Sequence, residues 1–451
     1  MLKKIQHKLF GQGEFRANLV RGAVGSLGVK LGSTLLGLVL AVLLARYLGA
    51  AGFGTYAFVL AAVTLMAIPT QLGLPMLLVR ETAKAQVNAQ WGVMRGLWRW
   101  ATLTVGSISL LLAMVAVLIG LVFTNHFEAN QLATFAWGIV LIPMIALGNL
   151  RGAALRGLRR VVLGQLPEFI LRPALLSILF LAAALFLAPS RLTSAQAMGL
   201  HVVAAALAFV AGAFLLWRSR PPEMRDRPHP EYRTREWFAA ALPLALMSGM
   251  QLINQSTDII LLGLMCSTEE VGVYKVVVTG AALVAFGLQA ITLSLSPHFV
   301  RLHSQGDKQR LQRLVTLSAR GILLFALPIV LVLVVWGEAV LEMVFGPEYA
   351  IGKTALAILA MGQLVNAGMG SVGMLLTMTG HERETARAVM MAAVVNVSLN
   401  LVLIPLWGIN GAALSGALTL TVWNLVMRRA VHRHLGIESM AFRIFPTKRA
   451  S

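Results

Sequence analysis

The stretch ARYLGAAGFGTYAFVL, residues 45–60, lies between two long apolar runs, and a similar phrase, CSTEEVGVYKVVV at residues 266–278, returns in the second half of the chain. Each phrase contains a glycine followed two residues later by a tyrosine, and each tyrosine is followed by a glutamine at the same spacing. The matched pairs, each 218 residues apart, are Gly54 with Gly272, Tyr56 with Tyr274 and Gln71 with Gln289. This internal repeat predicts a chain built from two related halves.

The composition predicts that the chain lies in a lipid bilayer. Of its 451 residues, 58% are hydrophobic and only 12% are charged, whereas a typical soluble domain has about 25% charged residues. The net charge of +20 would suggest nucleic acid in a soluble protein, but the basic residues sit in loops between apolar runs, so no nucleic-acid partner is expected. Cys266 is the only cysteine, which excludes an internal disulfide and a multi-cysteine metal site, and no cofactor or metal is expected.

The apolar runs can be counted, because a bilayer core about 30 Å thick requires about 20 apolar residues per helix. The first half has six runs, at approximately residues 27–45, 55–79, 100–123, 131–150, 166–188 and 195–217. The second half has six more, at approximately residues 237–265, 271–300, 321–336, 354–379, 388–405 and 410–427. The last two are divided by the phrase PLWGING. The sequence therefore predicts an all-α polytopic membrane protein with twelve transmembrane helices.

The distribution of basic residues predicts the orientation, because short cytoplasmic loops retain Lys and Arg. With the N-terminus inside, the loops predicted outside hold only Arg46, Arg191, Lys275 and Lys353 of the 38 basic residues. Those loops instead carry Glu128, Glu269, Glu270, Glu338, Glu342 and Glu348. Both termini are therefore expected to be cytoplasmic. No small-residue cleavage site follows the basic N-terminus, so a removed signal peptide is not expected, and a short N-terminal helix on the membrane surface is.

The longest polar connection, RSRPPEMRDRPHPEYRTRE, divides the predicted helices into two sets of six. Its prolines favour an extended linker. The predicted organisation is a six-helix lobe at residues 1–217 that includes the short N-terminal helix, a cytoplasmic linker at 218–236, a second six-helix lobe at 237–430 and a cytoplasmic tail at 431–451. An even number of crossings per lobe predicts parallel repeats related by a pseudo-two-fold axis along the membrane normal.

Each repeated phrase falls in the predicted outer turn between the first two helices of its lobe. The sequence alone suggests that Gly54 and Gly272 permit those sharp turns, and that Tyr56 and Tyr274 lie at the water interface. The interface between the two lobes is the expected substrate path.

Three longer stretches carry a family resemblance. They are LLARYLGAAGFGTYAFVLAAVTLMAIPTQLGLPMLLVRETA at residues 43–83, GNLRGAALRGLRR with ILRPALL at 148–176, and DIILLGLMCSTEEVGVYKV at 258–276. In this order the chain resembles the polysaccharide transporter branch of the MOP flippase superfamily, which includes bacterial O-antigen and other oligosaccharide-lipid flippases. The similarity covers nearly the whole chain. Lipid II flippases of the superfamily usually carry two extra helices, which this sequence does not show.

The resemblance implies two six-helix lobes around a central cavity that opens alternately to either side of the bacterial inner membrane. It implies movement of undecaprenyl-diphosphate-linked oligosaccharide, with membrane lipids and a polysaccharide polymerase complex as further partners. A carrier of this kind has an anionic diphosphate and a polar glycan, so a transporter must shield both from the bilayer. Charged and hydrogen-bonding side chains inside the predicted helices are therefore the candidate substrate-binding residues.

In the first lobe the candidates are Lys30, Glu168 and Arg172. Arg172 follows Glu168 by four residues, a spacing that favours an ion pair on one helical face. A diphosphate could compete for Arg172, or the pair could sit near the cytoplasmic helix end with the arginine reaching water. The same two alternatives remain open for Lys30. His201, alone in the sixth predicted helix, is expected to be a packing residue.

In the second lobe the candidates follow helical spacing. One stripe of the seventh predicted helix carries Gln251, Asn254, Gln255 and Asp258, and the eleventh carries Asn396 and Asn400. These side chains either bond neighbouring helices or line the cavity. Lys275 is the expected charge partner of Asp258, and Asp258 is also a possible proton or sodium coupling site.

Two other functional classes follow from the same features. A multidrug exporter of the related multidrug and toxic compound extrusion family is the alternative, but it should need embedded carboxylates, and the first lobe has only Glu168 beside an arginine. A membrane enzyme should show a sizeable outer loop with paired catalytic groups, and the loops here are short. An enzyme is therefore not expected. The sequence also has no nucleotide-binding P-loop, so energy must come from an ion gradient, the membrane potential or substrate removal on the far side.

Overall fold

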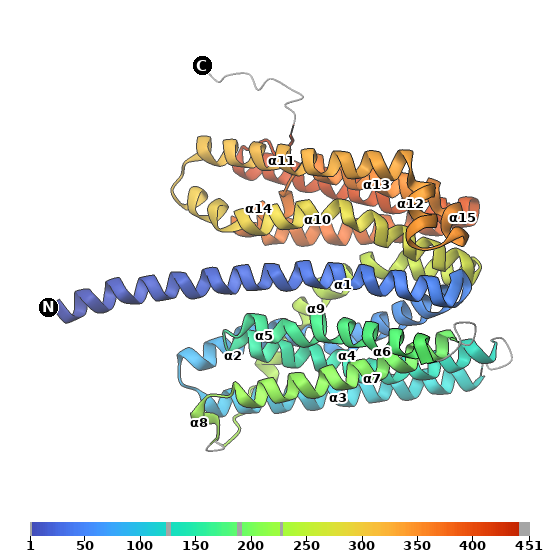
Figure 1. Cartoon of the computed structure of the whole chain (residues 1–451). Coiled ribbons are helices and arrows are strands. Elements are labelled where there is room, and N and C mark those ends of the chain that lie inside the picture. The colour runs from blue at the N-terminus through green and yellow to red at the C-terminus, as the bar shows by residue number, and fades with distance from the viewer. Residues whose placement is uncertain (1, 123–127, 187–191, 226–228, 442–451) are drawn as a thin grey trace. The chain divides into compact units, whose positions relative to one another are not determined.

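The computed structural model describes residues 2–122, 128–186, 192–225 and 229–441, and within these ranges the regular structure is helical, with no strand (Figure 1). The helices of the first half are α1 (Leu2–Gln71), α2 (Leu74–Val87), α3 (Trp91–Val122), α4 (Ala129–Gly157), α5 (Val161–Leu166), the π-helix η2 (Pro167–Leu171), α6 (Arg172–Phe186), α7 (Ser194–Arg218) and α8 (Pro222–Arg225). Those of the second half are α9 (Thr234–Met265), α10 (Thr268–Ser304), α11 (Lys308–Val335), α12 (Gly337–Val344), the 3₁₀ helix η4 (Pro347–Gly352), α13 (Lys353–Met369), α14 (Val372–Met378) and α15 (Glu382–Leu435).

Many of these helices are long and apolar enough to cross a membrane, which makes the chain a multi-pass membrane protein. Within the described residues nine helices meet this test, and the two parts of α9, bent by 50°, meet it together. Two of the nine are too long for one crossing: 47 residues of α1, which breaks at Gly49, and the 54 residues of α15, which breaks at Gly408. If each break separates two crossings, the described helices supply the twelve that the sequence predicts.

The break in α15 is a reversal of the chain. The Ser415 hydroxyl donates to the carbonyl of Asn396 at 3.3 Å. Nineteen residues of straight helix would separate these positions by about 28 Å, at about 1.5 Å per residue. Gly408 therefore forms the turn between two antiparallel helices, and its φ of 53° is in the left-handed region that favours glycine.

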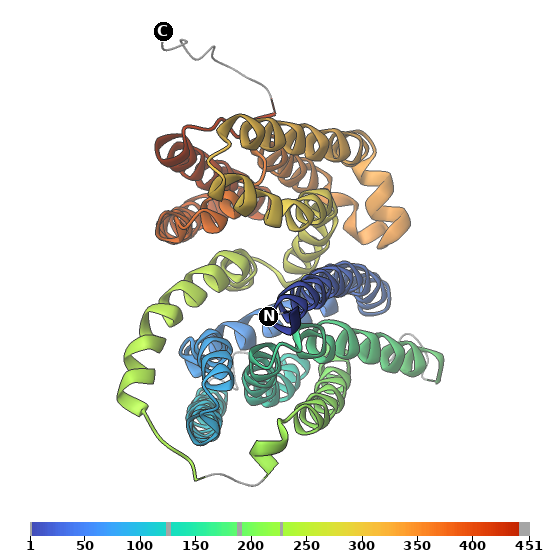
Figure 2. The ribbon, with the colours of Figure 1, turned by 90° about the vertical axis from the view of Figure 1, so that its left-hand side faces the viewer.

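The chain divides into two compact units. Unit 1 comprises Met1–Leu40, Met66–Leu187 and Ala195–Leu246, and unit 2 comprises Ala41–Leu65, Ala188–Ser194 and Met247–Ser451. In Figure 2 many helices of each unit are seen nearly end-on, whereas the yellow-green start of α9 runs across the view. The core of unit 1 includes Leu77, Met94, Leu97, Leu155 and Trp237, and that of unit 2 includes Phe299, Leu311, Leu376, Met427 and Val431. The division into lobes at the linker 218–236 stays a prediction.

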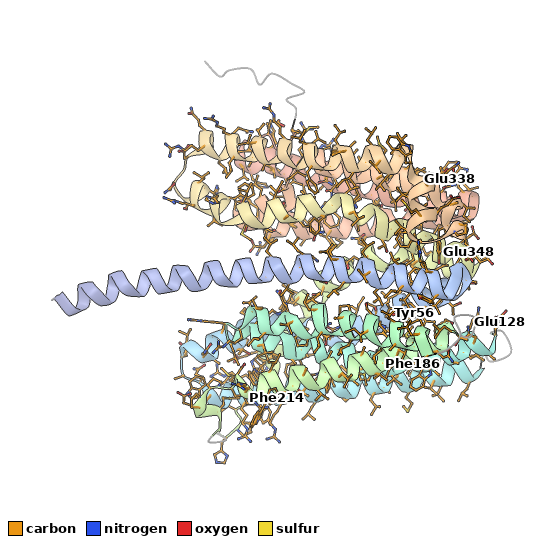
Figure 3. The ribbon with its side chains drawn as sticks, in the orientation of Figure 1. Tyr56, Glu128, Phe186, Phe214, Glu338 and Glu348 are labelled. Carbon is orange, nitrogen blue, oxygen red and sulfur yellow. The ribbon has the colours of Figure 1, made fainter. Side chains whose placement is uncertain are left out.

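The opening stretch is fixed within unit 2 by residues of α12 and η4. Gly49 has a φ of 67°, which breaks α1, and the carboxylate of Glu348 accepts the amide proton of Ala50 at 2.8 Å where the helix resumes. Arg46 donates to the backbone carbonyls of Met343 and Val344, the latter at 2.8 Å. Figure 3 labels Glu348 at this end of unit 2. The turn between the first two predicted spans is thus held by distant residues.

The repeated glycines serve a different purpose from the one that the sequence suggests. Gly54 and Gly272 have no positive φ, and the turns lie at Gly49 and at the gap between α9 and α10. A Cβ on Gly54 would stand 1.7 Å from the carbonyl oxygen of Thr268, and a Cβ on Gly272 would stand 2.0 Å from that of Ala50. The expectation of glycine turns is wrong, because the missing side chains instead allow two helices to touch backbone to backbone.

This contact is reciprocal under the repeat. Thr268 follows Ala50 by the same 218 residues that separate Gly272 from Gly54. Each repeat therefore offers its glycine to the carbonyl at the matching position of the other, as a contact across a two-fold axis requires.

Two further expectations need correction. The matched tyrosines are buried, with Tyr56 only 3% and Tyr274 0% exposed, so neither lies at a water interface. Tyr274 is buried because its hydroxyl has a polar partner inside the protein, described below. A separate short N-terminal helix is also absent: α1 begins at Leu2 and continues to Gly49, since no proline interrupts its hydrogen bonds. The side chains of residues 2–24 lie outside the described part.

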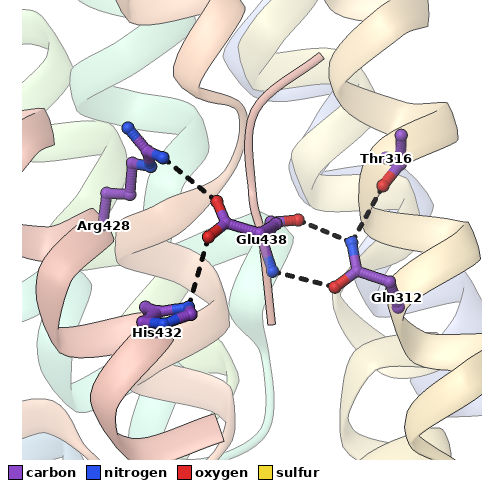
Figure 4. Close-up of polar contacts among 5 residues, drawn as sticks. All are labelled: Gln312, Thr316, Arg428, His432 and Glu438. Atoms are coloured by element: carbon purple, nitrogen blue, oxygen red, sulfur yellow. Dashed lines mark hydrogen bonds and ion pairs between the residues drawn. The ribbon is translucent and has the colours of Figure 1, made fainter. Parts of the chain in front are cut away.

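The end of α15 and the segment after it pack back onto unit 2 (Figure 4). The Glu438 carboxylate pairs with Arg428 at 3.1 Å and with His432 at 3.2 Å. Its backbone amide donates to the Gln312 side chain at 2.8 Å, and its carbonyl accepts from that side chain at 2.7 Å. The Ala441 amide donates to the Gly368 carbonyl at 3.0 Å. These contacts tie the segment to α11 and to the end of α13.

Candidate functional site

Unit 1 carries an ion pair inside a membrane-spanning helix. Arg172 Nη1 lies 3.3 Å from Glu168 Oε2, and the two side chains are 26% and 13% exposed. The ion pair that the four-residue spacing favours is therefore present. Glu168 lies in the π-helix between α5 and α6, a type of helix found often at functional sites. Gly148 of α4 makes room for it, since a Cβ there would stand 2.1 Å from Glu168 Oε1.

Arg151 joins this pair, and the sequence reasoning missed it as a site residue. Its guanidinium lies 3.2 Å from the ring centroid of Phe209 on α7, and Nη1 donates to the Phe209 carbonyl. Its Nη2 is buried and has no hydrogen-bond partner within the described residues. Arg151 and Glu168 line one narrow crevice. The available signal was the position of Arg151 in GNLRG, directly after the predicted span at residues 131–150.

Lys30 and His201, the other first-lobe residues considered, do not belong to the ion pair of Glu168 with Arg172. Lys30 is exposed, and its carbonyl accepts the Thr34 hydroxyl at 3.0 Å. His201 is buried, 5% exposed, within electrostatic reach of Arg172. Its burial agrees with the packing role expected from the sequence.

Unit 2 carries a half-buried carboxylate within a network from three helices. Asp258 on α9 accepts the Tyr274 hydroxyl of α10 at 3.0 Å and the Asn400 amide of α15 at 2.9 Å. Asn400 also donates to the Asn396 carbonyl at 3.0 Å, and that carbonyl accepts Ser415. The exposed fractions of Asn396 and Asn400 are 2% and 0%. The two polar stripes of the second lobe supply six candidate residues. The structure brings three of them together: Asp258, Asn396 and Asn400.

The expected pairing of Asp258 with Lys275 is wrong. Within the described residues no basic side chain lies within salt-bridge distance of Asp258. The neighbouring residue Tyr274 occupies the face of α10 that meets Asp258, and successive helical residues point about 100° apart. Lys275 therefore does not share the face of α10 that meets the carboxylate.

The remaining polar residues of α9 do not share the network. Asn254 donates to the Val389 carbonyl at 3.2 Å, whereas its carbonyl oxygen is buried without a partner in the described residues. Gln255 is exposed. The side chain of Gln251 lies outside the described part of the chain. Among the described residues no group of three His, Cys, Asp or Glu side chains could hold a metal ion.

The two units each carry acidic side chains at one end. Figure 3 labels Glu128 at one end of unit 1, with Phe186 nearby and Phe214 toward the opposite end, and labels Glu338 and Glu348 at one end of unit 2. Arg95, Arg99, Arg151 and Arg220 lie toward the Phe214 end of α3, α4 and α7. The arginine-rich end of unit 1 also carries Glu223, so the basic residues rather than the acidic ones are concentrated at one end.

Two family profiles match the chain. The profile described as polysaccharide biosynthesis protein matches residues 19–303, more than half of the chain, and the MatE profile matches residues 243–402. Two curated relatives are both from the archaeon Haloferax volcanii. A probable low-salt glycan biosynthesis flippase, Agl15, is 26% identical over 37% of this chain, and a probable flippase, AglR, is 29% identical over 39%. The chain spans only 35% and 37% of the length of these relatives.

Solved structures share the fold at low sequence identity. An inward-facing multidrug resistance MATE family transporter of the MOP superfamily matches with a TM-score of 0.70 and 13% identity, covering 92% of this chain and 98% of that one. The lipid II flippase MurJ in an inward closed conformation matches with a TM-score of 0.68 and 14% identity, covering 90% of this chain and 87% of that one. The chain therefore shares the fold of these two membrane transporters.

Proposed function

The chain belongs to the polysaccharide biosynthesis protein family, and from that premise we propose that it moves a lipid-linked oligosaccharide between the two leaflets of a membrane by alternating access. The observation that carries this proposal is the family match over residues 19–303, in a chain with the MOP transporter fold. Undecaprenyl diphosphate as carrier and an O-antigen, capsule or exopolysaccharide repeat unit as glycan belong to the proposal. The proposal also includes a location in the bacterial inner membrane, cytoplasmic termini and a polymerase partner. The relatives named as flippases are archaeal.

The arginines of unit 1 supply the chemistry that a diphosphate needs. Arg172 is held by Glu168 and remains one-quarter exposed, and Arg151 lies beside the same carboxylate. A guanidinium binds phosphate oxygens through two parallel hydrogen bonds. In the proposed mechanism the diphosphate displaces Glu168 from Arg172, and the carboxylate takes the arginine back when the substrate leaves.

Asp258 of unit 2 is the proposed coupling residue. A charge inside a bilayer is costly and is commonly part of a proton or ion pathway. Asp258 accepts two hydrogen bonds and lies within ion-pair distance of no described basic residue, so binding a proton would remove its charge without leaving an arginine or lysine unpaired. Binding and release of that proton would bias the equilibrium between the two access states.

The test is flipping of a labelled undecaprenyl-diphosphate oligosaccharide in proteoliposomes. Wild type is compared with Arg172→Ala, Asp258→Asn and, as a matched control, Arg313→Ala, an exposed arginine of α11. Loss of a charge-assisted contact should slow flipping about tenfold or more for Arg172→Ala, whereas Arg313→Ala should flip at the wild-type rate. Asp258→Asn should abolish the response to an imposed proton gradient.

A proton-coupled drug exporter is the second candidate, because the MatE profile matches residues 243–402, which include the half-buried Asp258. Efflux of organic cations by the wild type, without flipping of any lipid-linked glycan, would reject the flippase proposal in favour of this one. The ion pair of Glu168 with Arg172 favours an anionic substrate instead.

A further inference from the structure

A cavity of about 580 Å³ lies wholly within unit 1, between α3, α4 and α7. Its volume is within the range of about 300–1,000 Å³ that small-molecule sites occupy. Four arginines line it, Arg95, Arg99, Arg151 and Arg220, and none of its lining residues is acidic. The proposed transport mechanism makes no use of Arg95, Arg99 or Arg220.

One face of α3 forms the basic wall. Arg95, Trp98, Arg99 and Thr102 follow the spacing of three, four and seven residues that places side chains on one helical stripe. The Trp98 ring is fixed, because its indole nitrogen donates to the Thr82 hydroxyl at 3.0 Å. Arg99 is exposed, so its guanidinium is accessible to a ligand.

The opposite side is closed by α4 and α7. Arg220 follows the last turn of α7 and is exposed, and Arg151 of α4 lies deeper, against Phe209. The carboxylate near Arg151, Glu168, lines a neighbouring crevice rather than this cavity and already pairs with Arg172. The cavity therefore combines accessible guanidinium groups with a positive interior.

The rest of the lining is apolar and reaches the outer surface of the helices. Leu147, Leu150 and Leu216 line the cavity, and Leu103, also in the lining, is 69% exposed. Phe214 and Trp217, on the last turns of α7, are 54% and 63% exposed. Exposed apolar side chains on a membrane-spanning helix face lipid, and aromatic residues gather at headgroup level. The cavity is thus accessible from the bilayer near one membrane surface.

A ligand for this cavity needs an anionic head and an apolar body. A free phosphate would leave the leucines without a partner, and a sugar would find few hydroxyl or amide groups, since Thr102 is the one hydroxyl or amide side chain in the lining. Basic pockets between transmembrane helices on the cytoplasmic side are typical sites for acidic lipid headgroups. We propose that this cavity binds an anionic phospholipid from the leaflet on the side of the membrane where these arginines lie. The lipid phosphate would bind Arg99 and Arg220, and an acyl chain would lie along Leu103.

Arg151 lines both this cavity and the crevice of the proposed transport site, but Arg99 and Arg220, the proposed phosphate ligands, belong to the cavity alone. Lipid binding at these two arginines is tested without transport. The protein is purified in detergent with equal amounts of phosphatidylglycerol and phosphatidylcholine, and the lipids that it retains are counted by native mass spectrometry. Wild type should retain phosphatidylglycerol selectively. Arg99→Gln combined with Arg220→Gln should weaken that retention by about fivefold for each arginine, the contribution of a basic residue near an anionic membrane.

Two further variants separate the cavity from general charge and from misfolding. Arg310→Gln combined with Arg313→Gln removes the same charge from exposed positions of α11 and should retain phosphatidylglycerol as the wild type does. Ala213→Trp fills the cavity from an exposed position without changing charge, and should also reduce retention. Equal retention by the cavity variants and the α11 control, or equal retention of both lipids by the wild type, would overturn the proposal.

The fluorescence of Trp98, which lines the cavity, reports whether the lipid binds there. Phosphatidylglycerol with brominated acyl chains should quench Trp98 fluorescence, measured as the difference between wild type and Trp98→Phe, more than brominated phosphatidylcholine does. Displacement of the lipid by an equal concentration of inorganic phosphate would show that the site recognises a free anion, and would reject the lipid assignment.

Discussion

The carboxylate of Asp258 is held by hydrogen bonds from two other helices. Its partners Tyr274 and Asn400 are both fully buried, so each bond forms away from water. Removing one partner leaves the half-buried acceptor with fewer hydrogen bonds, which costs more than losing an exposed contact. Tyr274 is thus the residue through which the network is best tested.

Tyr274→Phe removes the hydroxyl that donates to Asp258 and should destabilise the protein by about 1–2 kcal/mol, because a half-buried acceptor loses its donor. The measurement is thermal unfolding in detergent, followed by intrinsic fluorescence. Tyr232→Phe, at a side chain that is 52% exposed, is the control and should leave the unfolding temperature unchanged. If Tyr274→Phe costs the same in wild type and in Asp258→Asn, the two residues are not coupled and the network as described is wrong.

Sequence reasoning succeeded at this scale where partners are close along the chain. Glu168 and Arg172 are four residues apart, and helical geometry alone predicts their contact. Asn400 lies 142 residues from Asp258, and no local rule connects them. Lys275 was paired with Asp258 on charge, but the side chain that reaches the carboxylate is the neighbouring Tyr274. Arg151 was missed because its contacts come from α7 and from the π-helix.

At the scale of helices, the Gly54 and Gly272 contact decides how α1 and α10 cross. Carbonyl oxygens stand within 2.0 Å of where each Cβ would lie, and backbone atoms cannot move aside as a flexible side chain can. Other glycines of α1 have open surroundings, among them Gly37. Gly54, in close contact, and Gly37, in open surroundings, therefore allow glycine-to-alanine substitutions to be compared within one helix.

Gly54→Ala should destabilise the protein by about 1–3 kcal/mol, the usual cost of overpacking, and Gly272→Ala should do the same. Gly37→Ala should be neutral or stabilising by up to about 1 kcal/mol, since alanine favours helix over glycine. Unfolding temperatures in detergent give the comparison. The double variant at positions 54 and 272 should cost less than the sum of the single variants, because one helix displacement relieves both clashes. Strict additivity would argue against a shared contact.

Helix existence was predictable from apolar runs, but helix ends were not. The predicted fifth span begins at residue 166, whereas the helix begins at Val161. A helix continues for as long as its backbone hydrogen bonds form, so its length is not limited to the roughly 20 residues that cross a bilayer. The predicted second span continues through residue 79, yet α1 ends at Gln71 and Gly73 has a φ of 69°. Apolar composition is the same on both sides of that break, so hydropathy does not detect it.

At the scale of the whole molecule, the only cysteine reports the orientation in the membrane. Cys266 lies between α9 and α10, beside Glu269 and Glu270, on the side predicted to be outside. Burial and the nearby Glu270 raise the pKa of its thiol, which lowers the thiolate fraction at neutral pH. Labelling should therefore be faster at pH about 8.5 than at pH about 7.

A membrane-impermeant maleimide should label Cys266 in intact cells. Ser304, exposed at the other end of the 37-residue helix α10, supplies the matched position. The variant Cys266→Ser combined with Ser304→Cys should be labelled only after the membrane is permeabilised. The reverse pattern would invert the predicted orientation and place both termini outside.

The reciprocal glycine contact bears on how such a chain could arise. A two-fold contact of this kind is what a homodimer of one half-length ancestor would form, and joining two gene copies end to end would preserve it. In a homodimer every substitution occurs twice. After fusion each copy can change alone, and the position matching Asp258 in the first repeat is Leu40, which has no carboxylate. Duplication thus lets one half keep the shared architecture while the other acquires a titratable group.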